Sequence, residues 1–340
     1  MHTPRSASPS RRALLTAGGA LGVGALVAAC GGGGGKTSAE PDRAKGPWSF
    51  RDDRGTTAKS AGTPARVVAF TAAAAALHDF GVECVGVFGP TKLKDGKADP
   101  QAGDLDVAKV TVLGNAWGEF NVEKYAALAP DLLVTNMYQP DALWYVPDDS
   151  KKKILSLAPS VAFTTAGVSL TEPIRRYAEL AASLGADPKA AKVADAKARF
   201  EKAAETLRRA AKAKGGLKVL AASGSADLLY VSTPGVYADL SYFRSLGLDI
   251  ITPGKVTGGF FENLSWENAD KYPADLILLD DRTAALQPKD LAAKPTWAQL
   301  PAVKAGQITP WASEPRFSYA GAAPLIERLA AAVEKAVKVA

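Results

Sequence analysis

Short apolar runs alternate along the chain with longer stretches of helix-forming residues. Arg66–Phe70 is rich in β-branched residues and predicts a buried strand, the alanine-rich stretch Thr71–Phe80 predicts a helix that ends at Gly81, and Val85–Phe88 predicts the next strand. A short hairpin is expected before them, at Trp48–Gly55. The folded part of the chain therefore opens with the strand–helix–strand order that is typical of parallel sheets.

The same alternation returns further along the chain. Glu123–Leu128 predicts a helix that leads into the strand Leu132–Thr135, and Thr171–Leu184 predicts an amphipathic helix. A second set has its strands at Lys218–Ala222 and Leu276–Asp280. Two such sets predict an α/β fold of two Rossmann-like lobes with mainly parallel sheets. Parallel sheets bind ligands on the loops beyond the carboxyl ends of their strands, so we expect a ligand cleft between the lobes.

Residues 1–29 have the pattern of a secretory signal peptide. A basic segment that ends in Arg11-Arg12 precedes an uncharged, glycine-containing stretch, which closes on Val27-Ala28-Ala29-Cys30. The stretch is short and glycine-rich for a membrane-spanning helix. Its end resembles a bacterial lipobox, in which the cysteine becomes the new N-terminus and is diacylated. The paired arginines resemble a twin-arginine signal, although ordinary export signals carry such pairs too.

This pattern predicts where the protein acts. Residues 30–46 begin with Cys30 and a run of glycines, and we expect them to form a lipidated, flexible tether. The lipid on Cys30 would hold the protein at the extracytoplasmic face of the cell membrane.

Composition excludes some classes of function. The net charge of +6 over 340 residues is too small and too scattered to indicate nucleic-acid binding. Apart from Cys30 the chain has one cysteine, Cys84, which lies in an apolar run and is expected to be a small buried side chain. Neither a disulfide framework nor a cysteine-based metal site is available.

Four segments of the chain resemble one family of binding proteins. They are Arg66–Gly89 (RVVAFTAAAAALHDFGVECVGVFG), Asn121–Val134 (NVEKYAALAPDLLV), Tyr177–Asp187 (YAELAASLGAD) and Pro295–Ile308 (PTWAQLPAVKAGQI). In this order they look like the substrate-binding proteins of ferric-siderophore and cobalamin ABC importers. The likeness runs from about Trp48 to the C-terminus.

The resemblance implies an organisation and a set of partners. The lobes would comprise residues 47–168 and 187–340, joined by a single long rigid helix within residues 169–186. The protein would be a monomer without catalysis or cofactor. It would bind a small-molecule iron chelate, an Fe(III)–siderophore, and deliver it to an ABC importer permease with its ATPase.

An iron–siderophore is a bulky complex whose metal is already surrounded by oxygen ligands. A protein holds such a complex through aromatic walls and a few donors, especially arginine, directed at the chelating oxygens. Residues of these types on predicted cleft loops are Trp117, Tyr138, Trp144, Tyr230, Phe260, Phe261, Arg282, Arg316 and Tyr319. Some have a simpler alternative: Tyr230 and Trp144 as core or surface aromatics, and Arg282 as an ion-pair partner of the neighbouring aspartates.

Two glutamates are candidates for contact with the permease. In the family, one glutamate on each lobe pairs with permease arginines, and the matching positions here are Glu123 and Glu267. Both also lie near predicted helix starts, where a carboxylate is favoured by the helix dipole.

Other functions fit the residues less well. A direct binder of zinc or manganese would need several histidines, and the chain has only His2, within the signal, and His78. An exported enzyme is disfavoured because the chain has neither a G-x-S-x-G nor an H-E-x-x-H motif, nor a Cys–His pair. Cobalamin and haem stay open as ligands, because both suit aromatic walls and haem accepts a tyrosine ligand. The mixture of arginine and aromatic residues favours an oxygen-rich ferric chelate, of the hydroxamate type before the catecholate type.

Overall fold

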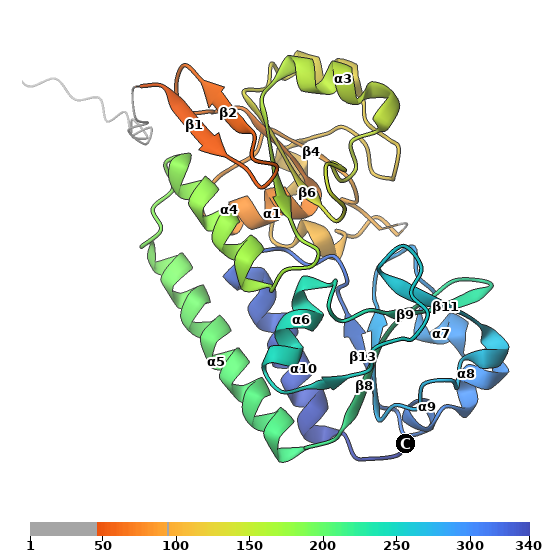
Figure 1. The fold of residues 1–340 in the computed structure, drawn as a ribbon. Helices are drawn as coiled ribbons and strands as arrows, with labels where there is room; N and C mark the ends of the chain where they lie inside the picture. The colour runs from red at the N-terminus through yellow and green to blue at the C-terminus, as the bar shows by residue number, and fades with distance from the viewer. Residues whose placement is uncertain (1–45, 94) are drawn as a thin grey trace, which may run out of the picture. The chain divides into compact units, whose positions relative to one another are not determined.

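A computed structural model describes residues 46–93 and 95–340 (Figure 1). The expected signal peptide, Cys30 and nearly all of the expected tether lie outside the described residues. The chain enters the fold through the predicted hairpin, formed by β1 (Trp48–Arg51) and β2 (Thr57–Ser60).

The first lobe is built around a five-stranded sheet in which every strand runs parallel to its neighbours, in the order β5-β4-β3-β6-β7. Its strands are β3 (Val67–Phe70), β4 (Gly86–Phe88), β5 (Thr111–Val112), β6 (Leu132–Met137) and β7 (Ser160–Thr164). The chain runs outward from β3 to β5 on one side and from β6 to β7 on the other. The strand order therefore reverses between β3 and β6, which is where open parallel sheets bind ligands.

The helices of the first lobe are short. They are α1 (Thr71–Asp79), η1 (Pro100–Ala102), η2 (Val107–Lys109), α2 (Val122–Ala127) and α3 (Asp148–Leu157). Helix α1 is buried along nearly its whole length, because its alanines allow the backbone to pack closely against its neighbours. Cys84 is buried as predicted; burial, assisted by the charge of Glu83, raises the pKa of its thiol to about 12.

Two helices carry the chain from the first sheet to the second. The predicted connecting helix is present as α4 (Thr171–Ser183), but a longer helix, α5 (Ala191–Ala213), follows it. Gly185 separates them, since its φ of +96° is suited to the end of a helix. Helix α4 packs on β1, β7 and α1, whereas α5 lies along α10 (Tyr319–Lys335) (Figure 1). The long helix of the fold is therefore α5.

The second lobe contains a six-stranded mixed sheet, with the order β11-β9-β8-β12-β13 and with β10 paired to β8. Its strands are β8 (Lys218–Gly224), β9 (Leu228–Ser232), β10 (Asp249–Ile250), β11 (Phe261–Ser265), β12 (Leu276–Asp280) and β13 (Ile308–Trp311). Strands β8, β10, β12 and β13 are parallel, as predicted. Strand β9 runs antiparallel to β8, because the three residues between Gly224 and Leu228 are too few for a crossover.

Short helices and α10 complete this lobe. The remaining ones are α6 (Ala238–Ser245), η3 (Trp266–Asn268), α7 (Pro288–Leu291), α8 (Pro295–Gln299) and α9 (Pro301–Lys304). One hydrophobic core extends from the first sheet through α4, α5 and α10, and a second core forms around Trp266 and Trp297. Within the described ranges, every helix is too short or too polar to cross a membrane.

Candidate functional site

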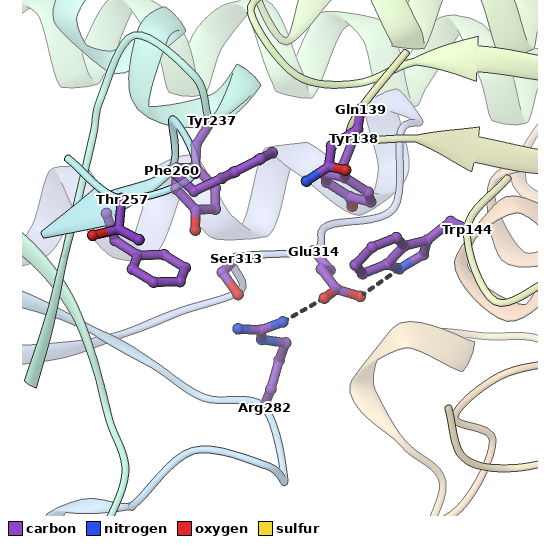
Figure 2. A pocket seen from close by; sticks show the side chains of 11 residues that line it. Tyr138, Gln139, Trp144, Tyr237, Thr257, Phe260, Arg282, Ser313 and Glu314 are labelled. Carbon is purple, nitrogen blue, oxygen red and sulfur yellow. Dashed lines mark hydrogen bonds and ion pairs between the residues drawn. The ribbon is translucent and has the colours of Figure 1, made fainter. Parts of the chain in front are cut away.

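A cavity of about 320 Å³ lies between the two lobes (Figure 2). The first lobe contributes Tyr138, Gln139 and Trp144, and the second lobe contributes Tyr237, Thr257, Gly258, Phe260, Phe261, Arg282, Ser313 and Glu314. Five of these were predicted as ligand-binding residues: Tyr138, Trp144, Phe260, Phe261 and Arg282. The predicted cleft between the lobes is thus present and is bordered by aromatic rings on both sides.

The wall from the first lobe is aromatic. Tyr138 directly follows β6, whose carboxyl end lies at the reversal point of the first sheet. Its ring packs against that of Trp144, with centroids 4.7 Å apart. Trp117 packs edge-on against Trp144 at 4.8 Å and is 64% exposed, so it extends this wall outward from the cavity.

Two hydrogen bonds of its own backbone hold Trp144 in place. The Trp144 N–H donates to the Asn136 carbonyl, and its own carbonyl accepts from the Thr135 hydroxyl at 2.7 Å. Tyr145, the next residue, has a φ of +60°, an unfavourable value for an aromatic residue. Stacking of its ring on Phe70, at 5.2 Å, helps to hold it there. The sharp turn at Tyr145 leaves Trp144 directed into the cavity.

The hydroxyl group of Tyr138 is available to a ligand. It is buried and makes no hydrogen bond of good geometry among the described residues, although the Thr165 hydroxyl acts on it and lowers its pKa. Burial raises the pKa of this hydroxyl well above its usual value, so at neutral pH it carries its proton. A buried donor without a hydrogen bond of good geometry is unfavourable, and a chelating oxygen in the cavity would satisfy it.

The wall from the second lobe depends on a glycine turn. Gly258 and Gly259 have φ values of +61° and +85°, and the Phe260 N–H donates to the Thr257 carbonyl across them. This is the geometry of a tight hairpin turn, which two glycines adopt without strain. The turn presents Phe260 and Phe261 to the cavity, where Phe260 meets Tyr237 edge-on at 6.0 Å.

A guanidinium lies at one side of the cavity. Arg282 follows β12, and its Nε and Nη2 atoms donate to both oxygens of Asp280 at 2.7–3.0 Å. Asp280 is fully buried and also accepts from the Ser313 hydroxyl at 3.1 Å. Burial opposes the charge of Arg282, but Asp280 and Glu314 outweigh it and raise the pKa of the guanidinium. Arg282 therefore pairs with an aspartate, as the predicted alternative had it, and also lines the cavity.

Glu314 joins the two lobes at the cavity. Its carboxylate accepts from Arg282 in the second lobe and from Trp144 Nε1 at 3.2 Å in the first (Figure 2). It also accepts from Gln101 Nε2 of the first lobe at 3.3 Å. Only 7% of Glu314 is exposed. A single buried carboxylate thus links the aromatic wall of one lobe to the guanidinium of the other.

The structure does not bring every predicted residue to this cavity. Tyr230 lines an adjoining cavity of about 270 Å³ in the second lobe, where its ring packs on Phe261. Arg316 lines a third cavity and pairs with Asp79 at 3.3 Å. Tyr319 packs between Phe80 and Phe200.

The two glutamates expected to contact a permease are exposed. Glu123 lies in the first turn of α2 and Glu267 in the first turn of η3. These positions suit both of the roles considered for them, docking and helix-start stabilisation.

Sequence reasoning missed six lining residues: Gln139, Tyr237, Thr257, Gly258, Ser313 and Glu314. A signal existed for Ser313 and Glu314, since they follow β13 just as Arg282 follows the adjacent parallel strand β12. For Tyr237 the sequence carried no comparable signal.

The described residues contain no cluster of three or more histidine, cysteine or acidic side chains that could hold a metal. His78 lies away from the cavity lining and hydrogen-bonds to Glu83 at 2.7 Å. What the lining offers a ligand is aromatic surface, a tyrosine hydroxyl and a guanidinium.

Known proteins share this fold and much of this sequence. Residues 76–315 match the family described as periplasmic binding protein. The chain is 57% identical to DesE, a ferric-siderophore receptor protein from Streptomyces coelicolor, with a TM-score of 0.84; the match covers 86% of this chain and 100% of DesE.

Two more distant relatives match the chain, one by sequence and one by structure. The chain is 22% identical over 260 residues to the Fe(3+)-citrate-binding protein YfmC of Bacillus subtilis, which is 76% of each chain. It is 18% identical to the petrobactin-binding protein YclQ of Bacillus subtilis, with a TM-score of 0.66 over 86% of this chain and 100% of YclQ.

Proposed function

Because the chain belongs to the periplasmic binding protein family, we propose that it captures an intact iron–siderophore complex, of the hydroxamate type, outside the cytoplasm and delivers it to an ABC importer. The observation that carries this proposal is the cavity itself. Aromatic rings from both lobes face a space beside a guanidinium and a tyrosine hydroxyl without a hydrogen bond of good geometry. These are groups that hold a preformed, oxygen-coordinated metal complex.

The relative DesE supports the same ligand class. It is 57% identical to this chain and is a ferric-siderophore receptor. The cavity lies within the usual size range of small-molecule sites. Its surface is mainly apolar, which suits a hydroxamate complex with its aliphatic linkers better than a highly charged chelate.

Ligand binding can be followed through tryptophan fluorescence, because Trp144 lines the cavity and Trp117 packs against it. A ferric trihydroxamate should quench the emission of the purified protein, whereas ferric salt without chelator should not. Trp144→Phe should weaken binding of the chelate, and Trp297→Phe, in the core of the second lobe, should leave the affinity unchanged. If no ferric siderophore changes the tryptophan fluorescence while cobalamin or haem does, the proposed ligand is wrong.

Delivery would depend on Glu123 and Glu267. Both are exposed and outside the cavity lining, so replacing both with glutamine should abolish uptake of radioactive iron chelate by cells while the purified protein binds as before. A matched control is Glu201→Gln with Glu205→Gln, two exposed glutamates on α5. A loss of chelate affinity in the first variant would contradict the docking role.

Lipid anchoring follows from the sequence of the signal. Cys30→Ala should move the protein from the membrane fraction to the surrounding medium or periplasm. Uptake should fall while chelate binding is unchanged. A variant that stays in the membrane fraction would contradict the anchor.

A further inference from the structure

We propose that Glu314 sets the charge selectivity of the cavity, so that the protein binds neutral or cationic ferric chelates and discriminates against anionic ones. This inference rests on the proposed function, since it names the charge class of the chelate. It assigns Glu314 a role in specificity.

The charged groups at the cavity do not balance. Arg282 and Glu314 are the charged residues of the lining, and Asp280 lies directly against Arg282. One guanidinium is thus shared between two carboxylates, of which Asp280 is fully buried and Glu314 is 7% exposed. A chelate that enters the cavity meets an excess of negative charge. Because both carboxylates are buried, their charge is screened less than it would be on the surface.

The two walls of the cavity also differ in charge, because Glu314 hydrogen-bonds to Trp144 of the first-lobe wall, whereas Arg282 pairs with Asp280 of the second lobe. The tyrosines beside the cavity agree with this arrangement. At the first-lobe wall, burial and then the negative charge of Glu314 raise the pKa of Tyr145 to about 12, and Arg282 opposes them with a smaller effect. For Tyr138, too, burial and then Glu314 raise the pKa of the hydroxyl, and Arg282 opposes them with a smaller effect. At the second-lobe wall, burial raises the pKa of Tyr237 to about 12, and Arg282 is the strongest charged influence on it.

This polarity gives a bound chelate a preferred orientation. Its chelating oxygens would face Arg282, and any positive charge would lie by Tyr138 and Trp144. There the aromatic faces and the Glu314 carboxylate attract a cation together. An anionic substituent would be repelled at the same place.

A structural role for Glu314 can be separated from a role in selectivity. Its oxygens also accept hydrogen bonds from Trp144 and Gln101, so removal of the whole side chain would disturb the contact between the lobes. Glu314→Gln keeps the shape and one acceptor oxygen, removes the charge, and turns the other acceptor into a donor. The ratio of affinities for two chelates within one variant is unaffected by the fraction of protein that is folded.

The test uses three ferric trihydroxamates with the same iron centre. One carries a terminal amine and is cationic, the second is its neutral acetyl derivative, and the third is its anionic succinyl derivative. For the unaltered protein we expect the cationic and neutral forms to bind about 30-fold more tightly than the anionic form, as like charges in a buried site require. In Glu314→Gln the ratio should fall to about threefold or less. Glu327→Gln, an exposed glutamate paired with Arg199, removes the same charge outside the cavity and should keep the full ratio.

The outcomes separate the two proposals. If none of the three chelates binds, the proposed function fails. If all three bind the unaltered protein equally, the function stands and the charge selectivity is refuted, whether or not the variant folds. Discrimination that persists unchanged in Glu314→Gln also refutes the assignment to Glu314.

Discussion

Replacing Arg282 with leucine tests whether the buried charges beside the cavity depend on one another. The substitution leaves Asp280, which is fully buried, without its positive partner, while Ser313 and the backbone N–H of residue 282 still donate to it. Breaking a buried ion pair by removing one partner costs about 3–5 kcal/mol. The Arg282 side chain is itself 35% exposed, so water moderates the effect. We therefore expect a loss near the lower end of that range, about 3 kcal/mol.

Urea unfolding followed by circular dichroism measures this loss, at neutral pH and without ligand. The double variant Asp280→Asn with Arg282→Leu removes the unpaired charge and should recover all but about 1 kcal/mol of the stability. Glu314 should contribute little to the cost, because Trp144 and Gln101 still donate to it. A loss below about 1 kcal/mol in the single variant, or a double variant no more stable than the single one, would refute this reasoning.

Two further predictions concern the second lobe and the contact between lobes. Burial raises the pKa of Asp239 from 3.8 to about 7, so the folded protein keeps a proton that the unfolded chain releases, and stability should fall as pH rises across this window. In the unaltered protein, the free energy of unfolding in urea should fall by at most about 4 kcal/mol between pH 4 and pH 8. Asp239→Asn keeps an acceptor for Trp311 Nε1 and should remove this fall. An unchanged pH profile in the variant would contradict the raised pKa. Gly103→Ala would place a Cβ 2.1 Å from Arg316 Nη1 and displace it from Asp79, so we expect a melting-temperature drop equivalent to about 1–3 kcal/mol. The drop should shrink in an Arg316→Ala background, and an equal drop there would show that Arg316 is not the cause.

The sequence predicted the parts of the site that depend on one lobe alone. Tyr138 and Arg282 follow the buried strands β6 and β12, and the rule that parallel sheets bind at the carboxyl ends of their strands was enough to find them. Phe260 and Phe261 were found through their glycine turn. The antiparallel strand β9 was also within reach of the sequence, since the connection before it is too short for a crossover.

Contacts between the lobes could not be predicted in this way. Asp79 and Arg316 are 237 positions apart, and nothing in either segment indicates that they pair. Arg316 therefore had the right residue type and a suitable place after a strand, but its charge is used by a buried aspartate. Glu314 follows β13 and could have been found by that place, but its hydrogen bonds with Trp144 and Gln101 of the other lobe could not.

The most direct test of the central claim is anomalous diffraction at the iron absorption edge from crystals grown with a ferric trihydroxamate. We expect one iron peak in the cavity bordered by Trp144, Tyr237, Phe260 and Arg282, at a distance from every side chain that excludes direct coordination by the protein. Iron bound directly to protein side chains, or a chelate found only outside this cavity, would contradict the capture of an intact complex between the lobes.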